Sequence, residues 1–157
     1  MRAGFGFDAH RLVAGRPLIL GGCRIPYDRG LEGFSDGDAI AHALIDAILG
    51  AAALGDCGSR FPAGDPRYAG ADSVKLLAEA ASIVSRAGFR VNNVDCTIVA
   101  EEPKLATHIE SMRIALAKAL NIDVARCSVK AKRTEGLGFT GRGEGITTYA
   151  IATLDEL

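Results

Sequence analysis

Hydrophobic and polar positions follow two different periods along this chain. Alternation over a few residues predicts strands, and apolar residues at i, i+3 and i+4 predict helices. In chain order, the pattern predicts a strand at 2–12, a hairpin-like excursion at 17–25, helices at 38–54 and 72–88, a strand at 89–100, a helix at 107–121, and strands at 127–132 and 146–154. This order favours an α+β fold of one domain, residues 1–157, in two layers: a mixed sheet with helices on one face.

The helix boundaries are predicted from residues that suit helix ends. Asp38 and Asp72 are expected in or next to the first turn of the first two helices, where a carboxylate is favourable. Thr107 followed by Glu110 predicts a capping box at the start of the third helix. Residues 55–70 are rich in Gly, Pro and Asp and are expected to form a loop, long enough to be a functional-loop candidate.

Two polar motifs stand out within apolar elements. Asp8 and His10 share one face of the first strand, and Asp38, His42 and Asp46 form a stripe along the first helix. A carboxylate and two histidines from separate elements would leave one coordination position open, which is typical of catalytic zinc. Asp46 is expected to accept a hydrogen bond from the second ring nitrogen of a metal-bound His42. A buried stripe of ion pairs is the alternative reading of the same residues.

The composition narrows the class of protein. Hydrophobic residues make up 48% and charged residues 24% of the chain, which is ordinary for a globular domain. A net charge of −1 argues against nucleic acid as a partner. No apolar run is long enough to predict a membrane span, and the first residues do not resemble a secretory signal. The four scattered cysteines predict reduced thiols, so we expect a cytoplasmic protein whose metal is not bound by sulfur.

A glycine-rich segment at 136–145 follows a group of basic residues. Its G-x-G-x-x-G spelling does not predict a dinucleotide site, because a strand and not a helix is expected next. The basic side chains near this segment suit phosphate oxygens, or alternatively form a solvated strand edge; they are Lys130, Lys132, Arg133 and Arg142. Glu135 offers an oxygen ligand for a Mg²⁺ that bridges two phosphates.

Taken together, these motifs resemble one family closely, the 2-C-methyl-D-erythritol 2,4-cyclodiphosphate synthases of the non-mevalonate pathway of isoprenoid (terpenoid) biosynthesis. The matching stretches run through essentially the whole chain: 6–10, 21–26, 35–38, 42–47, 50–56, 61–62, 70–73, 93–95, 103–104 and 137–145. The resemblance implies a lyase that forms a homotrimer with active sites between subunits. A cytidylyltransferase is a further partner to be considered.

The resemblance also implies ligands for two metals. Asp8, His10 and His42 would hold Zn²⁺, and Glu135 would hold Mg²⁺ or Mn²⁺ on the diphosphate. It implies that Ala100 and Lys104 grip the cytidine and that Phe139 and Arg142 lie near the threefold axis, where an isoprenoid diphosphate is expected. The full set of substrate-binding residues expected from the resemblance is Asp8, His10, Phe34, Ser35, Asp56, Cys57, Gly58, Phe61, Asp65, Ala100, Lys104, Lys132, Arg133, Thr134, Glu135, Phe139 and Arg142.

The reaction that the resemblance implies is an intramolecular phosphoryl transfer. The 2-phosphate of 4-diphosphocytidyl-2-C-methyl-D-erythritol 2-phosphate attacks the β-phosphorus, closes the cyclic diphosphate and releases CMP. Bringing two anions together in line makes positioning and charge neutralisation the main catalytic problems.

The chain departs from the family pattern at two positions thought to stabilise the transition state. Phe34 stands where the family has His, and Arg133 where it has a hydroxyl residue. Our hypothesis is that Arg133 supplies compensating positive charge at the phosphates. The departures leave one alternative open, a non-catalytic trimer that binds metal and isoprenoid diphosphate. A second alternative is a metal-dependent phosphohydrolase that uses the same Asp/His/His site with bound water.

Overall fold

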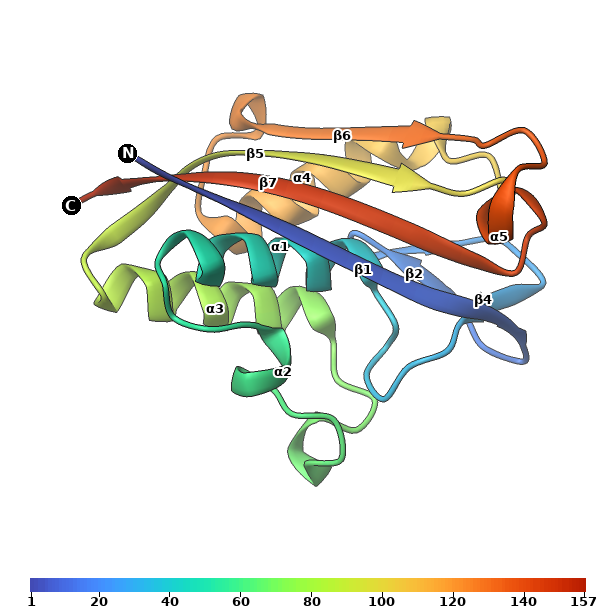
Figure 1. The fold of residues 1–157 in the computed structure, drawn as a ribbon, viewed down its shortest axis with the longest axis horizontal. Helices are drawn as coiled ribbons and strands as arrows, with labels where there is room; N and C mark the ends of the chain where they lie inside the picture. The colour runs from blue at the N-terminus through green and yellow to red at the C-terminus, as the bar shows by residue number, and fades with distance from the viewer.

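The computed structural model describes residues 1–157, which form one five-stranded sheet, one small hairpin and three long helices (Figure 1). The strands are β1 (Arg2–Ala14), β2 (Leu18–Leu20), β3 (Cys23–Ile25), β4 (Arg29–Leu31), β5 (Phe89–Val99), β6 (Cys127–Lys132) and β7 (Gly145–Glu156). The α-helices are α1 (Ala39–Ala51), α2 (Cys57–Arg60), α3 (Ser73–Arg86), α4 (Ile109–Leu120) and α5 (Gly138–Gly141), with 3₁₀ turns η1 (Pro66–Tyr68), η2 (Ala106–His108) and η3 (Val124–Arg126).

The sheet is mixed, as the sequence predicts. Its strand order is β4-β1-β7-β5-β6, in which β5 and β6 are parallel and the other neighbours antiparallel. The expected hairpin is the separate two-stranded sheet of β2 and β3. The carboxylate of Asp38 caps α1 and also accepts the backbone N–H groups of Gly21 and Gly22, at 2.9 and 2.8 Å, so this one side chain ties the hairpin turn to the helix.

The long helices α1, α3 and α4 cover one face of the sheet (Figure 1). The core between the layers contains 36 buried residues, to which α1 contributes a nearly continuous apolar surface. Neighbouring side chains of a strand point to opposite faces, so the even-numbered residues of β1 face α1. Gly6 makes this approach close, because a Cβ there would lie 1.8 Å from the carbonyl oxygen of Ala43.

The other face of the sheet carries apolar side chains that no helix covers. Phe5 is 62% exposed and Ile151 is 52% exposed, and they are partners across β1 and β7; in the next pair on this face, the ring centroids of Phe7 and Tyr149 lie 5.4 Å apart. Both chain termini lie at the same end of the sheet (Figure 1). None of the helices has the length and apolar character required to span a bilayer.

Two local predictions were wrong. The capping box is absent, because residues 106–108 form η2 and α4 begins at Ile109 without a side-chain cap. Glu110 instead pairs with Arg113 at 2.6 Å, one turn along the helix. The segment 55–70 is not a plain loop, since it contains α2 and η1, whose first turns are capped by Asp56 and Asp65.

Candidate active site

Asp8, His10 and His42 bring their side chains together between β1 and α1. Asp8 Oδ2 lies 2.7 Å from His10 Nε2 and 2.9 Å from His42 Nδ1, and the two nitrogens are 3.3 Å apart. One ligand atom from each residue lies within 4.8 Å of the other two. The side chains of Asp8, His10 and His42 remain 23%, 18% and 15% exposed, so the cluster is accessible from one side.

The outer ring nitrogens of both histidines are bound by the protein. His10 Nδ1 lies 2.6 Å from the backbone carbonyl oxygen of Glu32, which only accepts, so Nδ1 donates and, in the neutral ring, Nε2 carries the lone pair. His42 Nε2 lies 2.9 Å from Ser73 Oγ and 3.1 Å from Ser35 Oγ. Two inward-facing imidazole nitrogens and a carboxylate oxygen are the donor set of an open metal site, so these residues fit a divalent metal.

Asp46 does not support His42 as predicted. Its Oδ1 accepts the backbone N–H of Cys57 at 2.7 Å, which anchors the start of α2 to α1. The ring nitrogen expected to face Asp46 faces Ser73 and Ser35 instead. The spacing of His42 and Asp46 along one helix predicted that they would bond to each other. The neighbouring elements instead supply the hydrogen-bond partners of both side chains.

Charge coupling shifts the pKa of two ligands in the metal-free cluster. Burial raises the pKa of Asp8, but hydrogen bonds from His10 and His42 outweigh it, so the pKa lies below its ordinary value. Burial lowers the pKa of His10, but the hydrogen bond and attraction to Asp8 outweigh it, so this pKa lies above its ordinary value. The carboxylate therefore favours a cation between these side chains, either a proton or a metal.

A mainly apolar hollow of about 190 Å³ opens beside the histidines. Besides His10, it brings together five residues that the sequence predicts at the substrate: Phe34, Ser35, Cys57, Gly58 and Phe61. Asp56 and Asp65 do not line this hollow. Their carboxylates cap α2 and η1, and Asp65 also pairs with Arg67 at 2.7 Å.

The residues expected at the cytidine line a second, separate hollow of about 230 Å³. Its wall contains Ala100, Lys104, Lys132 and Arg133, and also Glu101, which sequence analysis missed. Lys104 and Lys132 form no ion pair within the chain, so their ammonium groups are available to an anion.

Several of the basic side chains predicted to meet phosphate are neutralised by carboxylates. Arg133 Nη2 lies 3.1 Å from Glu101 Oε1, and Lys130 and Arg142 pair with Asp95 and Glu144 at 2.5 and 2.8 Å. No spacing in the sequence connects Arg133 to Glu101, because β5 and β6 bring them together only as parallel neighbours.

Residues 134–142 form the tight segment between β6 and β7. Glu135 has a φ of +53°, and its backbone N–H donates to Glu101 Oε2 at 3.1 Å. Its carboxylate is not part of any three-residue metal cluster within the chain. Thr134 Oγ1 donates to the Leu137 carbonyl oxygen at 2.7 Å, and Phe139 lines a hollow of about 230 Å³ that also touches His10.

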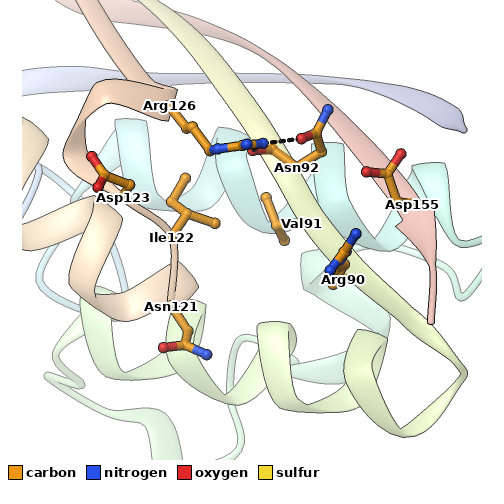
Figure 2. A pocket seen from close by; sticks show the side chains of 8 residues that line it. All are labelled: Arg90, Val91, Asn92, Asn121, Ile122, Asp123, Arg126 and Asp155. Atoms are coloured by element: carbon orange, nitrogen blue, oxygen red, sulfur yellow. Dashed lines mark hydrogen bonds between the residues drawn. The ribbon is translucent and has the colours of Figure 1, made fainter.

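A further hollow of about 310 Å³ contains none of the predicted site residues (Figure 2). Its lining residues come from the start of β5, the end of β7 and the segment that follows α4. The start of β5 and the end of β7 lie near the chain termini (Figure 1). Figure 2 shows that Arg126 reaches across it to Asn92, with Asp123 and Asp155 nearby. Its acidic and basic side chains are mixed, so its charge does not select a ligand of one sign.

Comparison with known proteins gives one consistent result. A family model described as the YgbB family matches residues 1–155. The chain is 58% identical over 154 residues to the 2-C-methyl-D-erythritol 2,4-cyclodiphosphate synthase of Moorella thermoacetica, a match that covers 98% of this chain and 94% of that protein.

Solved structures agree with this result. A CDP-bound form of 2C-methyl-D-erythritol-2,4-cyclodiphosphate synthase is 37% identical with a TM-score of 0.90, covering 98% of this chain and 100% of that one. The bifunctional IspDF from Campylobacter jejuni is 42% identical with a TM-score of 0.95, covering 99% of this chain, which spans 42% of that longer chain.

The fold and the cluster define a class: an α+β domain with an Asp–His–His cluster that fits a divalent metal and leaves a coordination position open, as in catalytic sites. The chain belongs to the YgbB family, the family of the 2-C-methyl-D-erythritol 2,4-cyclodiphosphate synthases.

Proposed function

We propose that this chain converts 4-diphosphocytidyl-2-C-methyl-D-erythritol 2-phosphate to 2-C-methyl-D-erythritol 2,4-cyclodiphosphate and CMP in isoprenoid biosynthesis. An oxygen of the 2-phosphate bonds to the β-phosphorus while the bond from that phosphorus to the α-phosphate oxygen breaks. The observation that carries the proposal is the Asp8–His10–His42 cluster beside a hollow, in a chain that belongs to this family.

The cluster is proposed to hold Zn²⁺, because two neutral imidazoles and one carboxylate suit that ion. The bound ion would polarise a phosphate oxygen and offset charge on the diphosphate. Glu135 is proposed to supply an oxygen ligand to Mg²⁺ or Mn²⁺ that the diphosphate itself brings.

The chain's own residues position the two ends of the substrate. The hollow lined by Phe34, Ser35 and Phe61 suits the methylerythritol end, which is apolar on one side and hydroxylated on the other. The hollow that contains Ala100 and Lys104 suits the cytidine. The unpaired ammonium groups of Lys104 and Lys132 would offset the charge of two phosphates held close together.

A homotrimer is proposed, with each active site formed by two neighbouring chains. Two features support it: the hollows for the two ends of the substrate are separate within one chain, and apolar side chains cover the outer sheet face. Contiguous exposed apolar surface of this kind is typical of an interface. Phe139 and Arg142 are proposed to lie near the trimer axis, where an isoprenoid diphosphate would bind.

Two further predictions remain proposals. The bifunctional IspDF, in which a chain similar to this one is part of a longer polypeptide, supports looking for association with a cytidylyltransferase. A cytoplasmic location also remains a prediction.

The experiment that tests the function is incubation of the protein with the diphosphocytidyl substrate, Zn²⁺ and Mg²⁺, followed by phosphorus NMR. The expected result is the cyclic diphosphate with an equal amount of CMP. Inorganic phosphate as the product would favour the phosphohydrolase, and bound substrate without CMP would favour the non-catalytic trimer.

A further inference from the structure

The ring of His42 is held from behind by a chain of hydrogen bonds that leads away from the cluster. His42 Nε2 lies 2.9 Å from Ser73 Oγ, and Ser73 Oγ lies 2.5 Å from Asp36 Oδ1. Ser73 is fully buried and is the first residue of α3. Ser73, 31 positions away from His42 in the sequence, therefore contacts Nε2 of the ring, while Nδ1 faces the cluster.

Asp36 is itself fixed in place by the backbone. Its Oδ2 accepts the N–H of Ser73 at 3.1 Å, and its Oδ1 accepts the N–H of Asp38 at 3.1 Å. Its own N–H donates to the Ala71 carbonyl oxygen at 3.0 Å. Asp36 thus joins the start of α1 to the start of α3, and the two helix ends that carry His42 and Ser73 are held together.

The donors and acceptors in the His42–Ser73–Asp36 series fix which group donates each hydrogen bond. A carboxylate only accepts, so the single hydroxyl proton of Ser73 is donated to Asp36. The oxygen of Ser73 then has only lone pairs left for His42, so the ring must donate from Nε2. With its proton on Nε2, His42 presents the lone pair of Nδ1 to Asp8 and His10, 2.9 and 3.3 Å away.

We propose that Ser73 and Asp36 are positioning residues that hold His42 in the Nε2–H tautomer and thereby set the metal affinity of the cluster. The proposal rests on the metal site proposed above, and it means that the first residue of α3 orients one of the metal ligands. Ser35 Oγ lies 3.1 Å from the same nitrogen and 3.3 Å from Ser73 Oγ; because no carboxylate fixes its proton, it gives no comparable direction. Partners behind a metal-bound histidine typically change metal affinity about 10- to 100-fold.

The test measures Zn²⁺ affinity by competition with a chromophoric chelator in the wild type and in the Ser73→Ala, Asp36→Asn and Asp72→Ala variants. Asp72→Ala is the matched control, since it removes the N-cap of α3 next to Ser73 without touching His42. We expect Ser73→Ala to weaken zinc binding about 10- to 100-fold. Asp36→Asn should weaken it less, because the amide oxygen still accepts the Ser73 proton, although less strongly than a carboxylate does. Asp72→Ala should leave it unchanged.

A second measurement does not depend on any variant folding. Nitrogen-15 NMR of the metal-free wild-type protein, at a pH where the histidine rings are neutral, should show His42 protonated at Nε2 and not at Nδ1. Protonation at Nδ1 instead would overturn the proposal, as would wild-type zinc affinity in folded Ser73→Ala. Equal losses in Ser73→Ala and Asp72→Ala would also overturn it, because they would trace the effect to α3 stability alone. Failure of the wild type to bind zinc at all would instead refute the metal site itself, and the inference with it.

Discussion

Gly6 of β1 lies against Ala43 of α1 so closely that a Cβ on Gly6 would be 1.8 Å from the Ala43 carbonyl oxygen. Asp8 follows Gly6 on the same face of the strand, and His42 precedes Ala43 on the helix. The close approach of the two backbones is therefore what allows Asp8 Oδ2 to lie 2.9 Å from His42 Nδ1, across 34 residues of sequence. The requirement for Gly6 and the pairing of Asp8 with His42 therefore depend on the same close packing of β1 against α1.

Gly6→Ala should destabilise the fold by about 3 kcal/mol or more, because the methyl group has no space and β1 must move away from α1. Gly50→Ala is the matched control in α1, where an added Cβ meets nothing within 4 Å and should stabilise by about 0.5–1 kcal/mol. Urea unfolding of both variants checks this. Equal stability of Gly6→Ala and wild type would contradict the close approach.

His10→Ala should abolish tight zinc binding and CMP release, because only two ligands would remain. The chain has three histidines, and His108 in η2 lies outside the cluster, so His108→Ala should bind zinc like the wild type. Isothermal titration with Zn²⁺ distinguishes the two. Loss of binding in both variants would show that the metal is bound elsewhere.

Zinc affinity should fall as the pH falls through the raised pKa of His10. The neighbouring Asp8 carboxylate stabilises the imidazolium, so the proton on Nε2 must be displaced by the metal. Below that pKa the affinity should drop about tenfold per pH unit.

In the metal-free protein the Asp8–His10 ion pair should stabilise the fold above the ordinary Asp8 pKa of 3.8. This stabilisation should be lost as the pH rises through the folded pKa of His10, which lies above 6.5. Zinc competition from about pH 5.5 to 8 and chemical unfolding without metal measure the two effects; a pH-independent zinc affinity would contradict this assignment.

Ile151→Glu should dissociate the proposed trimer, because it places a charge in the exposed apolar face of β7. Ile114→Glu is the matched control on α4, where an equally exposed isoleucine lies on the helical layer. Sedimentation velocity should show monomers for the first variant and trimers for the second. Trimers in both would remove this face from the interface.

Phe34→His should raise turnover, because it adds a donor beside the histidines, where losing one such donor costs about a hundred- to a thousand-fold. Arg133→Thr should lower turnover if Arg133 supplies charge to the phosphates. In the free chain this arginine is paired with Glu101 at 3.1 Å, so the hypothesis requires the bound substrate to compete with that carboxylate. Steady-state assays of CMP release decide it: unchanged turnover in Arg133→Thr together with a gain in Phe34→His would refute the compensation.

Local sequence patterns predicted the elements and the candidate metal ligands on them because those features depend on short distances along the chain. Alternation predicted that Asp8 and His10 share a face, and helical period predicted that His42 lies in an apolar helix. The α+β class and the mixed sheet followed from the order of the elements. The same local reasoning failed at Thr107 and Glu110, where a 3₁₀ turn displaced the helix start.

The sequence by itself thus determined which residues are available to a metal and which elements carry them. Only the tertiary structure decided which partners these and other site residues bond to. Ser73 and not Asp46 is hydrogen-bonded to His42, and Glu101 forms an ion pair with Arg133. The physical reason is that hydrogen-bond partners are selected by the packing of separate elements. Residues 31 or 32 positions apart meet only after the helices and strands have docked, and no period along the chain records that contact.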